Sequence, residues 1–261
     1  MNKKQTPRPL IAVTNDDSVF AHGLQVLIEE MKSIGDVVVV ASKYPMSGKG
    51  HSITSEVPIR LHLHKEEPGC KVHVTGGTPV DCFKLLHEVV LEGRTPDILV
   101  SGINHGCNAS INVLYSGTMG AAIEACMCGI PSVGFSLDDF SPEASFEHIR
   151  PFVKKITLDV LENGLPENTC LNVNFPPEYP GIKGTKVCKQ APAHWKQAFE
   201  KREDPHGIPY YWLKGNFVYE SDDTNDYTLL RKGYITIVPT HFDFTAHDQI
   251  QSLKKRFEDA E

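Results

Sequence analysis

The alternation of short apolar runs with helical patterns constrains the fold of this chain more than any other feature. Apolar runs at Leu10–Thr14 and Val37–Ala41 enclose residues 21–34, whose leucine, isoleucine and methionine side chains recur at helical spacing before Gly35. Glycine commonly ends a helix, and a strand, a helix and a second strand form a βαβ unit. Because that unit needs parallel strands, we predict a mostly parallel sheet covered by helices.

The same alternation continues to residue 175. Further strands are predicted at Val57–Leu63, Lys71–Thr75, Asp97–Ser101, Pro131–Leu137 and Cys170–Phe175, and helices from Thr78, over Gly117–Met127 and over residues 144–163. A long polar loop is predicted between Gly102 and Ser116. Residues 1–175 are therefore predicted to form a doubly wound, Rossmann-like α/β core.

The remaining residues, 176–261, have a different pattern. Residues 176–225 are rich in proline, aromatic and charged side chains, and the strand-like pieces Lys183–Lys189 and Tyr210–Tyr219 predict a projecting β-hairpin or arm. Gly233–Pro239 is predicted to return as a strand of the sheet, and His247–Phe257 to form a last helix. We interpret this region as part of the same domain as the core.

Charge and composition exclude several classes of function. The net charge is −7 and no long Lys/Arg block is present, so we expect no nucleic-acid polymer as a partner. The seven cysteines include no paired CxxC motif, which favours reduced thiols. Met1–Pro9 has no apolar segment, and no run approaches the roughly 18 apolar residues of a membrane helix. We therefore expect a cytoplasmic protein with no membrane partner.

Polar residues follow three of the predicted strands. Asn15-Asp16-Asp17 follows the first strand, Ser47-Gly48 lies in the loop after the second, and Gly102-Ile103-Asn104 follows Ser101. In open α/β sheets ligands bind at the carboxyl ends of the strands, so these clusters are predicted to converge. Oxygen ligands suit Mg²⁺ or Mn²⁺. The alternative is that Asn-Asp-Asp only caps the next helix.

The segment Tyr115–Gly120 begins a predicted helix with Ser116, Gly117 and Thr118. Free amides at a helix N-terminus, beside two hydroxyl groups, are typical of an anion site. An ordinary Ser/Thr cap is the alternative. The segment is not a Walker A loop, because no Gly-Lys-Ser/Thr sequence closes it.

Four other groups are weaker candidates. His62 and His64 share a strand face that could bind a metal, although exposed histidines explain the spacing equally, and His51 could contact a substrate. Asp222, Asp223 and Asp226 could form a second acidic site or an acidic turn. The remaining group, which could stack on a nucleobase or pack against a partner subunit, consists of Trp195, Tyr210, Tyr211 and Trp212.

Five ordered motifs between about residues 9 and 245 resemble those of the SurE survival-protein family. They are Val13–Asp17, Ser47-Gly48, Val74–Cys82, the pair Ser101–Asn108 and Val113–Thr118, and finally Asp222–Asp226 with Gly233–Thr236. The resemblance implies a Rossmann-like catalytic core with a projecting hairpin and a C-terminal arm. It also implies homodimers or homotetramers built by arm exchange.

The resemblance further implies a divalent-metal-dependent hydrolase that releases phosphate from 5′- and 3′-nucleoside monophosphates. Whether short polyphosphate is also cut is open. One Mg²⁺ or Mn²⁺ per subunit would be held by Asp16, Asp17, Ser47 and Asn104, of which Asp16, Asp17 and Asn104 are the catalytic candidates. The residues implied to bind phosphate are Asn15, Asn108, Ser116, Gly117 and Thr118.

Two departures from the family pattern concern the site. Ser18 stands where the family usually has glycine, and Ser110-Ile111-Asn112 replaces an often acidic stretch, so the substrate preference is open. The attacking group, water or Asp16, is also open. The rival hypotheses are a non-catalytic nucleotide-binding sensor on the same fold and a protein-interaction scaffold built on the arm.

Overall fold

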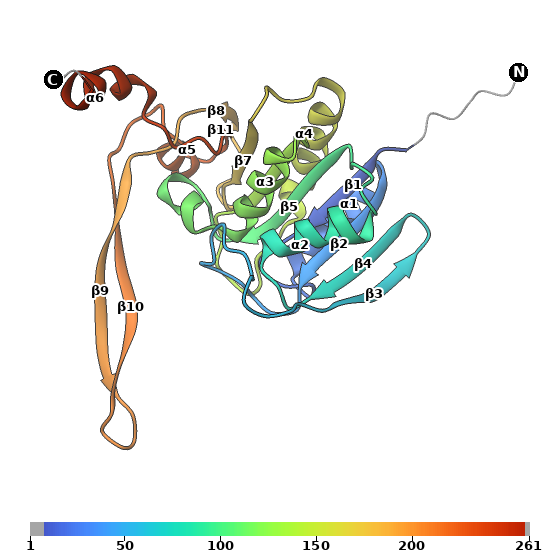
Figure 1. Ribbon diagram of the computed structural model, residues 1–261, viewed down its shortest axis with the longest axis horizontal. Helices are drawn as coiled ribbons and strands as arrows, with labels where there is room; N and C mark the ends of the chain where they lie inside the picture. The colour runs from blue at the N-terminus through green and yellow to red at the C-terminus, as the bar shows by residue number, and fades with distance from the viewer. Residues whose placement is uncertain (1–7, 259–261) are drawn as a thin grey trace, which may run out of the picture.

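The computed structural model describes residues 8–258, apart from the side chains of residues 197 and 198. Its centre is a nine-stranded sheet with the order β3-β4-β2-β1-β5-β6-β7-β11-β8 (Figure 1). Neighbouring strands from β4 to β7 are parallel, whereas β3 and β11 run antiparallel to β4 and β7. The strands are β1 (Leu10–Thr14), β2 (Asp36–Ser42), β3 (Leu61–Glu67), β4 (Cys70–Thr75), β5 (Ile98–His105), β6 (Ser132–Leu137), β7 (Cys170–Phe175), β8 (Gly184–Val187) and β11 (Tyr234–Thr240).

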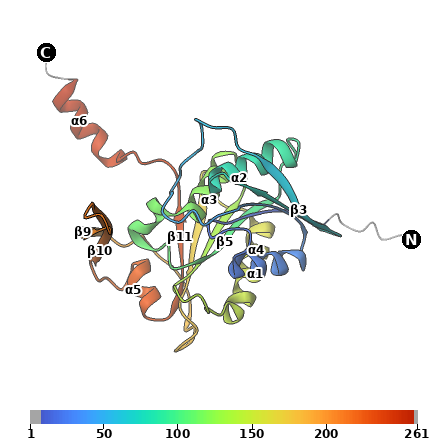
Figure 2. The same ribbon diagram turned by 90° about the horizontal axis from the view of Figure 1, so that it is seen from below.

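Helices cover both faces of the sheet (Figure 2). On one face α1 (His22–Lys32) and α4 (Arg150–Asn163) enclose a core that includes Leu24 and Val153. On the other face α2 (Pro79–Leu85), a π-helical turn over Leu86–Val90 and α3 (Gly117–Met127) enclose a second core. The predicted doubly wound α/β architecture is therefore confirmed. The predicted helix over residues 144–163 is shorter, because α4 starts at Arg150 after a 3₁₀ turn at Glu147–Ile149.

The winding of the sheet reverses beside β1. From β1 the chain builds β2 and β4 on one side and later β5, β6 and β7 on the other. The last residue of β1, Thr14, is paired with Ser101 of β5. Loops that follow β1 and β5 diverge from such a switch point and leave a crevice at the carboxyl edge of the sheet.

Strand β5 extends further than predicted. Residues 102–105 were expected to begin a polar loop, but they continue β5 after a register shift between Ser101 and Asn104. Gly102 has φ 130°, and a Cβ there would lie 2.4 Å from the carbonyl oxygen of Phe135. Glycine therefore permits an irregularity that re-aims the following side chains, as β-bulges do.

The strand predicted at Val57–Leu63 is displaced toward the C-terminus. Strand β3 starts at Leu61 and continues to Glu67, and its middle residues are exposed. It lies at the edge of the sheet, where packing does not select an alternating pattern, so alternation was a poor guide. His62 and His64 are exposed on this strand.

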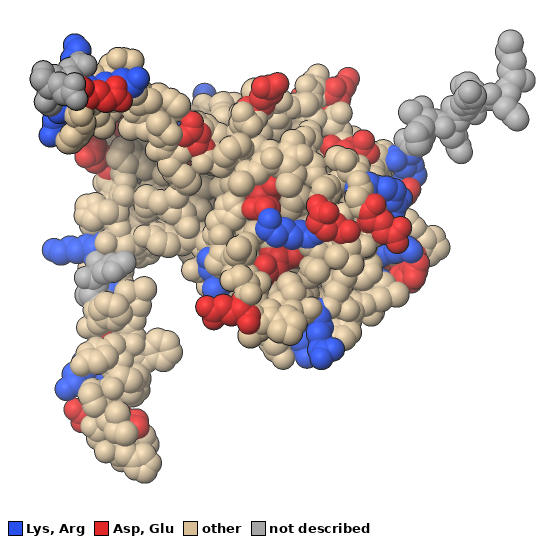
Figure 3. All heavy atoms as spheres, viewed as in Figure 1, with Lys and Arg blue, Asp and Glu red and all other residues tan. Residues whose placement is uncertain are grey.

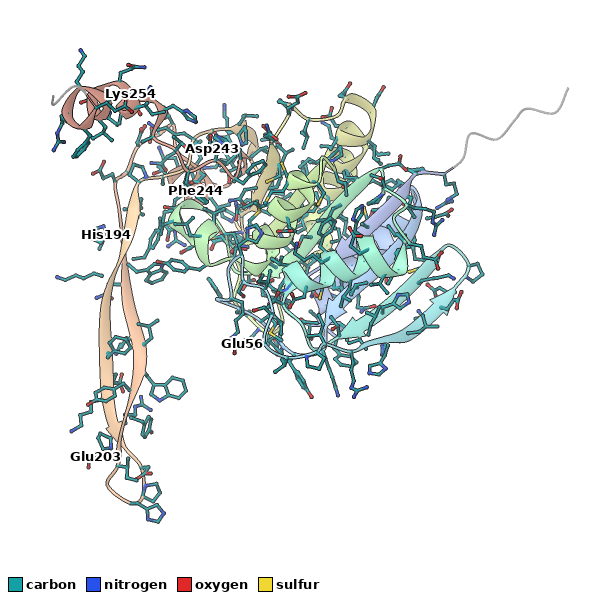
Figure 4. The ribbon with its side chains drawn as sticks, in the orientation of Figure 1. Glu56, His194, Glu203, Asp243, Phe244 and Lys254 are labelled. Atoms are coloured by element: carbon teal, nitrogen blue, oxygen red, sulfur yellow. The ribbon has the colours of Figure 1, made fainter. Side chains whose placement is uncertain are left out.

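A two-stranded hairpin projects from the body of the protein (Figure 1). Its antiparallel strands are β9 (Ala193–Glu203) and β10 (Pro209–Tyr219). Figure 4 places His194 near the base of this hairpin and Glu203 near its far end. The hairpin is confirmed, but assigning Lys183–Lys189 to it was wrong. Residues 184–187 form β8 and pair in parallel with β11, because β11 offers an open sheet edge close by in space.

After the hairpin the chain forms α5 (Asp226–Arg231), returns to the sheet as the predicted strand β11, and ends in a helix. A 3₁₀ turn at His247–Gln249 leads into α6 (Ile250–Phe257), which confirms the predicted last helix. Helix α6 has no buried residue and extends away from the sheet (Figures 1 and 2). The residues after β11 form the C-terminal arm, in which Figure 4 labels Asp243, Phe244 and Lys254.

Within residues 8–258, no helix combines the length and apolar character needed to cross a bilayer. The expected cytoplasmic location depends partly on the segment Met1–Pro9, of which residues 1–7 lie outside the described part of the chain. All seven cysteines are free thiols.

Candidate active site

One cavity of about 640 Å³ opens at the switch point of the sheet. Five of the predicted site residues line it: Asp16, Ser47, Asn104, Asn108 and Ser116. The other predicted residues are next to these in sequence and are not among the lining residues: Asn15, Asp17, Gly117 and Thr118. The predicted convergence of three separate polar clusters at one sheet edge is therefore seen in the geometry.

Asp16 is the most buried carboxylate of the cavity wall, with 3% of its surface exposed. Its Oδ1 accepts a hydrogen bond from the hydroxyl of Thr118 at 2.6 Å, which leaves Oδ2 as the less engaged oxygen. Burial, and then the neighbouring charge of Asp17, raise the pKa of Asp16 to about 6, against hydrogen bonds from Thr118. The site is thus short of positive charge.

Asp17 and Asn104 are held by the backbone after β5. Asp17 Oδ2 accepts the backbone N–H of His105 at 2.9 Å and lies 3.4 Å from His105 Nδ1. The amide nitrogen of Asn104 donates to the carbonyl oxygens of Gly106 at 2.7 Å and His105 at 3.2 Å. Because its nitrogen is occupied in this way, the side-chain oxygen of Asn104 is the end left for a ligand.

The loop that carries Ser47 is tied to the first cluster and to the start of α3. The backbone N–H of Met46 donates to the carbonyl of Asp16 at 2.7 Å, and that of Gly50 to Tyr115 at 3.0 Å. Gly50 has φ 55°, and a Cβ there would meet the carbonyl oxygen of Leu114 at 2.7 Å. Ser47 itself is exposed toward solvent and lines the cavity.

The Thr78 segment supports this loop from behind. The hydroxyl of Thr78 donates to the carbonyl of Ser52 at 2.7 Å, and Asp81 accepts the N–H groups of Thr54 at 3.1 Å and Thr78 at 2.9 Å. Thr78 and Asp81 also complete a capping box at the start of α2, as the predicted helix start requires.

Asn15 and Ser18 shape the turn after β1. The side-chain nitrogen of Asn15 donates to the carbonyl of Ser18 at 2.8 Å, whereas its buried oxygen has no hydrogen-bond partner. Ser18 has φ 97°, in the left-handed region that favours glycine. The departure from glycine therefore falls at a position where backbone strain is expected.

Helix α3 begins at the cavity. Ser116 caps it by accepting the N–H of Met119 at 3.0 Å, and its own hydroxyl proton remains free to donate. A Cβ on Gly117 would lie 2.9 Å from Asp16 Cβ and 2.8 Å from Pro79 Cγ. Glycine thus allows the positive end of α3 to approach Asp16 closely, while Thr118 orients the carboxylate.

Asn108 is held by a chain of buried amides from β7. Its backbone N–H donates to Asn174 Oδ1 at 2.7 Å, and its carbonyl accepts from Asn172 Nδ2 at 2.9 Å. Its side-chain nitrogen donates to Ser136 Oγ at 2.8 Å. These bonds fix the loop after β5, and no sequence motif pointed to Asn172, Asn174 or Ser136.

His51 lies outside the cavity wall. Its Nε2 is 2.7 Å from Glu124 of α3, and Lys84 of α2 pairs with the same carboxylate. Although burial alone raises the pKa of Glu124, hydrogen bonds from Lys84 and His51 bring it below its usual range. The cluster joins the Ser47 loop, α2 and α3.

The acidic segment near α5 has the contacts of a turn. Asp226 is buried and accepts the backbone N–H groups of Ser110 at 2.7 Å and Ala191 at 2.8 Å. Asp222 pairs with Lys189 Nζ at 2.7 Å. Between residues 8 and 258, no three His, Cys, Asp or Glu side chains gather so as to hold a metal ion by themselves.

Ten further residues complete the cavity wall, and four of them were singled out from the sequence: Gly48, Asn112, Tyr115 and Trp195. The full set is Gly48, His105, Gly106, Cys107, Asn112, Tyr115, Phe140, Trp195, Leu213 and Gly215. Phe140 lies in an irregular loop, and Leu213 and Gly215 lie on the hairpin, so periodicity gave no signal for them. Tyr210, Tyr211 and Trp212 are exposed on β10 and are not part of the wall.

Comparisons with known proteins agree with this architecture. The family model described as "Survival protein SurE" matches residues 11–197. The chain is 47% identical to the 5′-nucleotidase SurE of Cytophaga hutchinsonii, covering 95% of this chain and 96% of the relative. It is 51% identical to the 5′-nucleotidase SurE of Christiangramia forsetii, covering 97% of each.

A solved structure extends the agreement to three dimensions. The SurE protein from Aquifex aeolicus superimposes with a TM-score of 0.82 at 38% identity, covering 95% of this chain and 99% of that one. The chain belongs to the SurE survival-protein family.

Proposed function

We propose that this protein is a divalent-metal-dependent 5′-nucleotidase that hydrolyses nucleoside monophosphates to nucleoside and phosphate. The observation that carries the proposal is the convergence of Asp16, Ser47 and Asn104, from two loops and the end of β5, on one cavity beside the start of α3. Two relatives of matching length that bear the name 5′-nucleotidase support the same activity.

The oxygen atoms at the cavity fit a divalent cation. The hydroxyl of Thr118 binds Asp16 Oδ1, and the nitrogen of the Asn104 side chain makes both of that side chain's hydrogen bonds. Asp16 Oδ2 and the Asn104 side-chain oxygen are therefore the atoms left for a ligand. Asp17 Oδ1 and the Ser47 hydroxyl complete a set of hard donors, which suits Mg²⁺ or Mn²⁺. The raised pKa of Asp16 also fits, because two adjacent carboxylates need a compensating charge.

The start of α3 is the proposed phosphate site. The hydroxyl of Ser116 and the first amides of the helix, at Gly117 and Thr118, would donate to phosphate oxygens, and the helix dipole favours that charge. Asn108 would add the second proton of its side-chain amide as a further donor. Asn15 would act on the phosphate only through the turn that it holds.

The reaction follows from these positions. The cation, when bound, supplies positive charge against the phosphate and Lewis-acid activation of the attacking water. Thr118 holds Asp16 in place, and the α3 amides stabilise the charge that develops on the phosphate oxygens. The proposal takes water as the attacking group, with Asp16 orienting it.

The finer parts of the hypothesis stay predictions. We extend the proposed substrates to 3′-nucleoside monophosphates and include short polyphosphate among those to test. Assembly into homodimers or homotetramers by arm exchange is also proposed, and the exposed α6 supports it. We also propose that residues 1–175 form the catalytic core and that residues 176–261 form the hairpin and arm of the same domain. A cytoplasmic location is a further proposal.

The test uses metal-stripped protein and a panel of nucleoside monophosphates with added Mg²⁺, added Mn²⁺ or chelator. Phosphate release should require a metal and fall about 100-fold or more in Asp16→Asn. Asp36→Asn, a carboxylate at the opposite edge of the sheet, is the matched control and should retain activity. Metal-independent nucleotide binding without turnover would instead support the non-catalytic sensor.

A further inference from the structure

The cavity has an apolar half that the proposed phosphate chemistry does not use. The metal and phosphate candidates occupy one part of the wall, whereas Tyr115, Phe140, Trp195 and Leu213 contribute large apolar side chains to the rest. A volume of about 640 Å³ exceeds what a phosphate group and a cation fill and lies within the range of small-molecule sites. The apolar half therefore has room for the organic part of a substrate.

Trp195 is held in a defined position at the base of the hairpin. Its indole N–H donates to Asn112 Oδ1 at 3.0 Å, and its ring packs edge-to-face on Phe217 with centroids 5.1 Å apart. A Cβ on Gly215 would lie 2.8 Å from the indole ring, so glycine makes space for it. With 37% of its surface exposed, Trp195 keeps part of its ring free at the cavity.

The bond to Trp195 also orients Asn112. Because the indole is a donor only, it engages the side-chain oxygen of Asn112 and leaves the amide N–H groups free. Asn112 lies in the Ser110–Asn112 segment that departs from the family pattern, and it lines the cavity. The cavity thus presents a fixed hydrogen-bond donor beside an aromatic surface.

Phe140 contributes a second aromatic ring, from the irregular loop that follows β6. It is 76% exposed, yet its ring lies against Gly106, where a Cβ would meet Phe140 Cε1 at 2.2 Å. Gly106 has φ 92° and donates to the carbonyl of Leu137 at 2.8 Å. Phe140 therefore presents an exposed aromatic ring at the cavity, which a bound ligand would cover.

We propose that this apolar half is the nucleobase site, with Trp195 as a stacking surface, Phe140 as a second apolar contact and Asn112 as a donor to an acceptor atom of the base. The inference rests on the proposed nucleotidase function. Purine nucleotides are the preferred class, because a larger ring buries more apolar surface and stacks more strongly on an indole.

The experiment compares AMP with ribose 5-phosphate, which has the same sugar phosphate and no base. Trp195→Ala should lower the ratio of kcat/KM for AMP to that for ribose 5-phosphate by about 5- to 100-fold, the range expected for one base–aromatic stack. The loss should lie mainly in KM, and Trp195→Phe should restore part of it. Phe140→Ala should lower the same ratio, and its exposed position keeps the fold intact.

Trp212→Ala is the matched control. Trp212 is exposed on the same hairpin and does not line the cavity, so the ratio should match that of the unaltered protein. An equal loss on both substrates in Trp195→Ala, or no loss on either, overturns the inference. The second result would mean that Trp195 does not contact the base.

Adenosine binding, measured by calorimetry, separates this inference from the proposed function. If neither phosphate ester is hydrolysed but adenosine binds and loses affinity in Trp195→Ala, the nucleotidase proposal fails and the base site stands. If AMP is hydrolysed but adenosine binds all variants equally, the nucleotidase proposal stands and the base site is overturned.

Discussion

At the scale of single residues, the candidate site depends on two positions where backbone and side-chain demands conflict. Gly117 lets the first turn of α3 reach Asp16, so the metal and phosphate candidates share one place. Ser18 occupies a left-handed conformation that glycine would adopt more easily. Position 117 requires that no Cβ be present, whereas position 18 carries a Cβ at the expense of backbone strain.

Gly117→Ala should reduce both activity and stability. The new methyl group would meet Asp16 Cβ at 2.9 Å and Pro79 Cγ at 2.8 Å, so the start of α3 must shift away from Asp16. We expect kcat/KM to fall at least about tenfold and unfolding free energy to fall by about 1–3 kcal/mol. Enzyme assays and urea titration measure both, and unchanged kinetics would contradict the close-approach argument.

Ser18→Gly should stabilise the protein by about 0.5–1 kcal/mol, because it relieves the strain at φ 97°. The gain is partly offset by the greater freedom of glycine in the unfolded chain. Ser33→Gly is the control, since Ser33 has φ −68° and should lose stability on the same change. A denaturation midpoint for Ser18→Gly below that of the parent protein would exclude strain at this turn.

At the scale of secondary-structure elements, strands and helices hold the site through buried polar contacts. Strand β7 holds the loop after β5 through Asn172 and Asn174, although neither lines the cavity. Glu124 joins α3 to α2 and to the Ser47 loop. Each contact couples elements that are distant in sequence, so its loss should affect the geometry of the site as well as stability.

Asn174→Leu should raise the KM for nucleotide, although Asn174 does not line the cavity. The backbone N–H of Asn108 would lose its buried acceptor, which costs about 1–3 kcal/mol of stability and frees the loop that carries Asn108. We expect a higher KM for nucleotide in steady-state assays. Replacing the exposed Asn163 of α4 by leucine should change neither quantity, and an unaltered KM in Asn174→Leu would show that the loop is held elsewhere.

Glu124→Gln should destabilise the protein at neutral pH, by about 1–3 kcal/mol, because the charged hydrogen bonds to Lys84 and His51 are lost. The folded pKa of Glu124 is below its usual value, so its stabilisation is present above the unfolded pKa and is lost as the pH falls through the folded pKa. The two proteins should therefore converge in stability in acid. Denaturant titrations at several pH values test this, and a pH-independent difference would argue against the ion pair.

At the scale of the whole molecule, the distribution of charged and of exposed apolar side chains bears on the partners of this protein. Acidic and basic side chains are interspersed over the face shown in Figure 3. The arm, in contrast, exposes apolar side chains at Leu253 and Phe257 on a helix with no buried residue. A helix of that kind gains stability when it packs against another surface.

The double variant Leu253→Asp and Phe257→Asp should shift the protein toward lower mass in sedimentation velocity, if arms are exchanged between copies. Introduced carboxylates cannot be buried at an apolar contact without a large cost. Lys254→Asp and Lys255→Asp together change charge on the same helix and should leave the mass unchanged. A parent protein that sediments as one chain would contradict arm exchange.

The sequence supports some inferences better than others, for physical reasons. Buried strands such as β1 and β2 were predicted closely, because residues enclosed on both faces must be continuously apolar. The edge strand β3 was misplaced, since exposed strands have no such requirement, whereas β8 was predicted as a strand but assigned to the hairpin, because its partner β11 is distant in sequence. The bulge in β5 followed from the close approach of Gly102 to β6, which is a contact between distant segments.

The sequence by itself determined the α/β class, the mostly parallel sheet and the three polar clusters that meet at its edge, because local periodicity and the rule for parallel strands suffice for these. Only the tertiary structure decided which atoms of Asp16, Asp17 and Asn104 remain free for a ligand. It also decided that Phe140 and Trp195 share one cavity. Such arrangements depend on hydrogen bonds and packing between residues far apart in the chain, which no local pattern encodes.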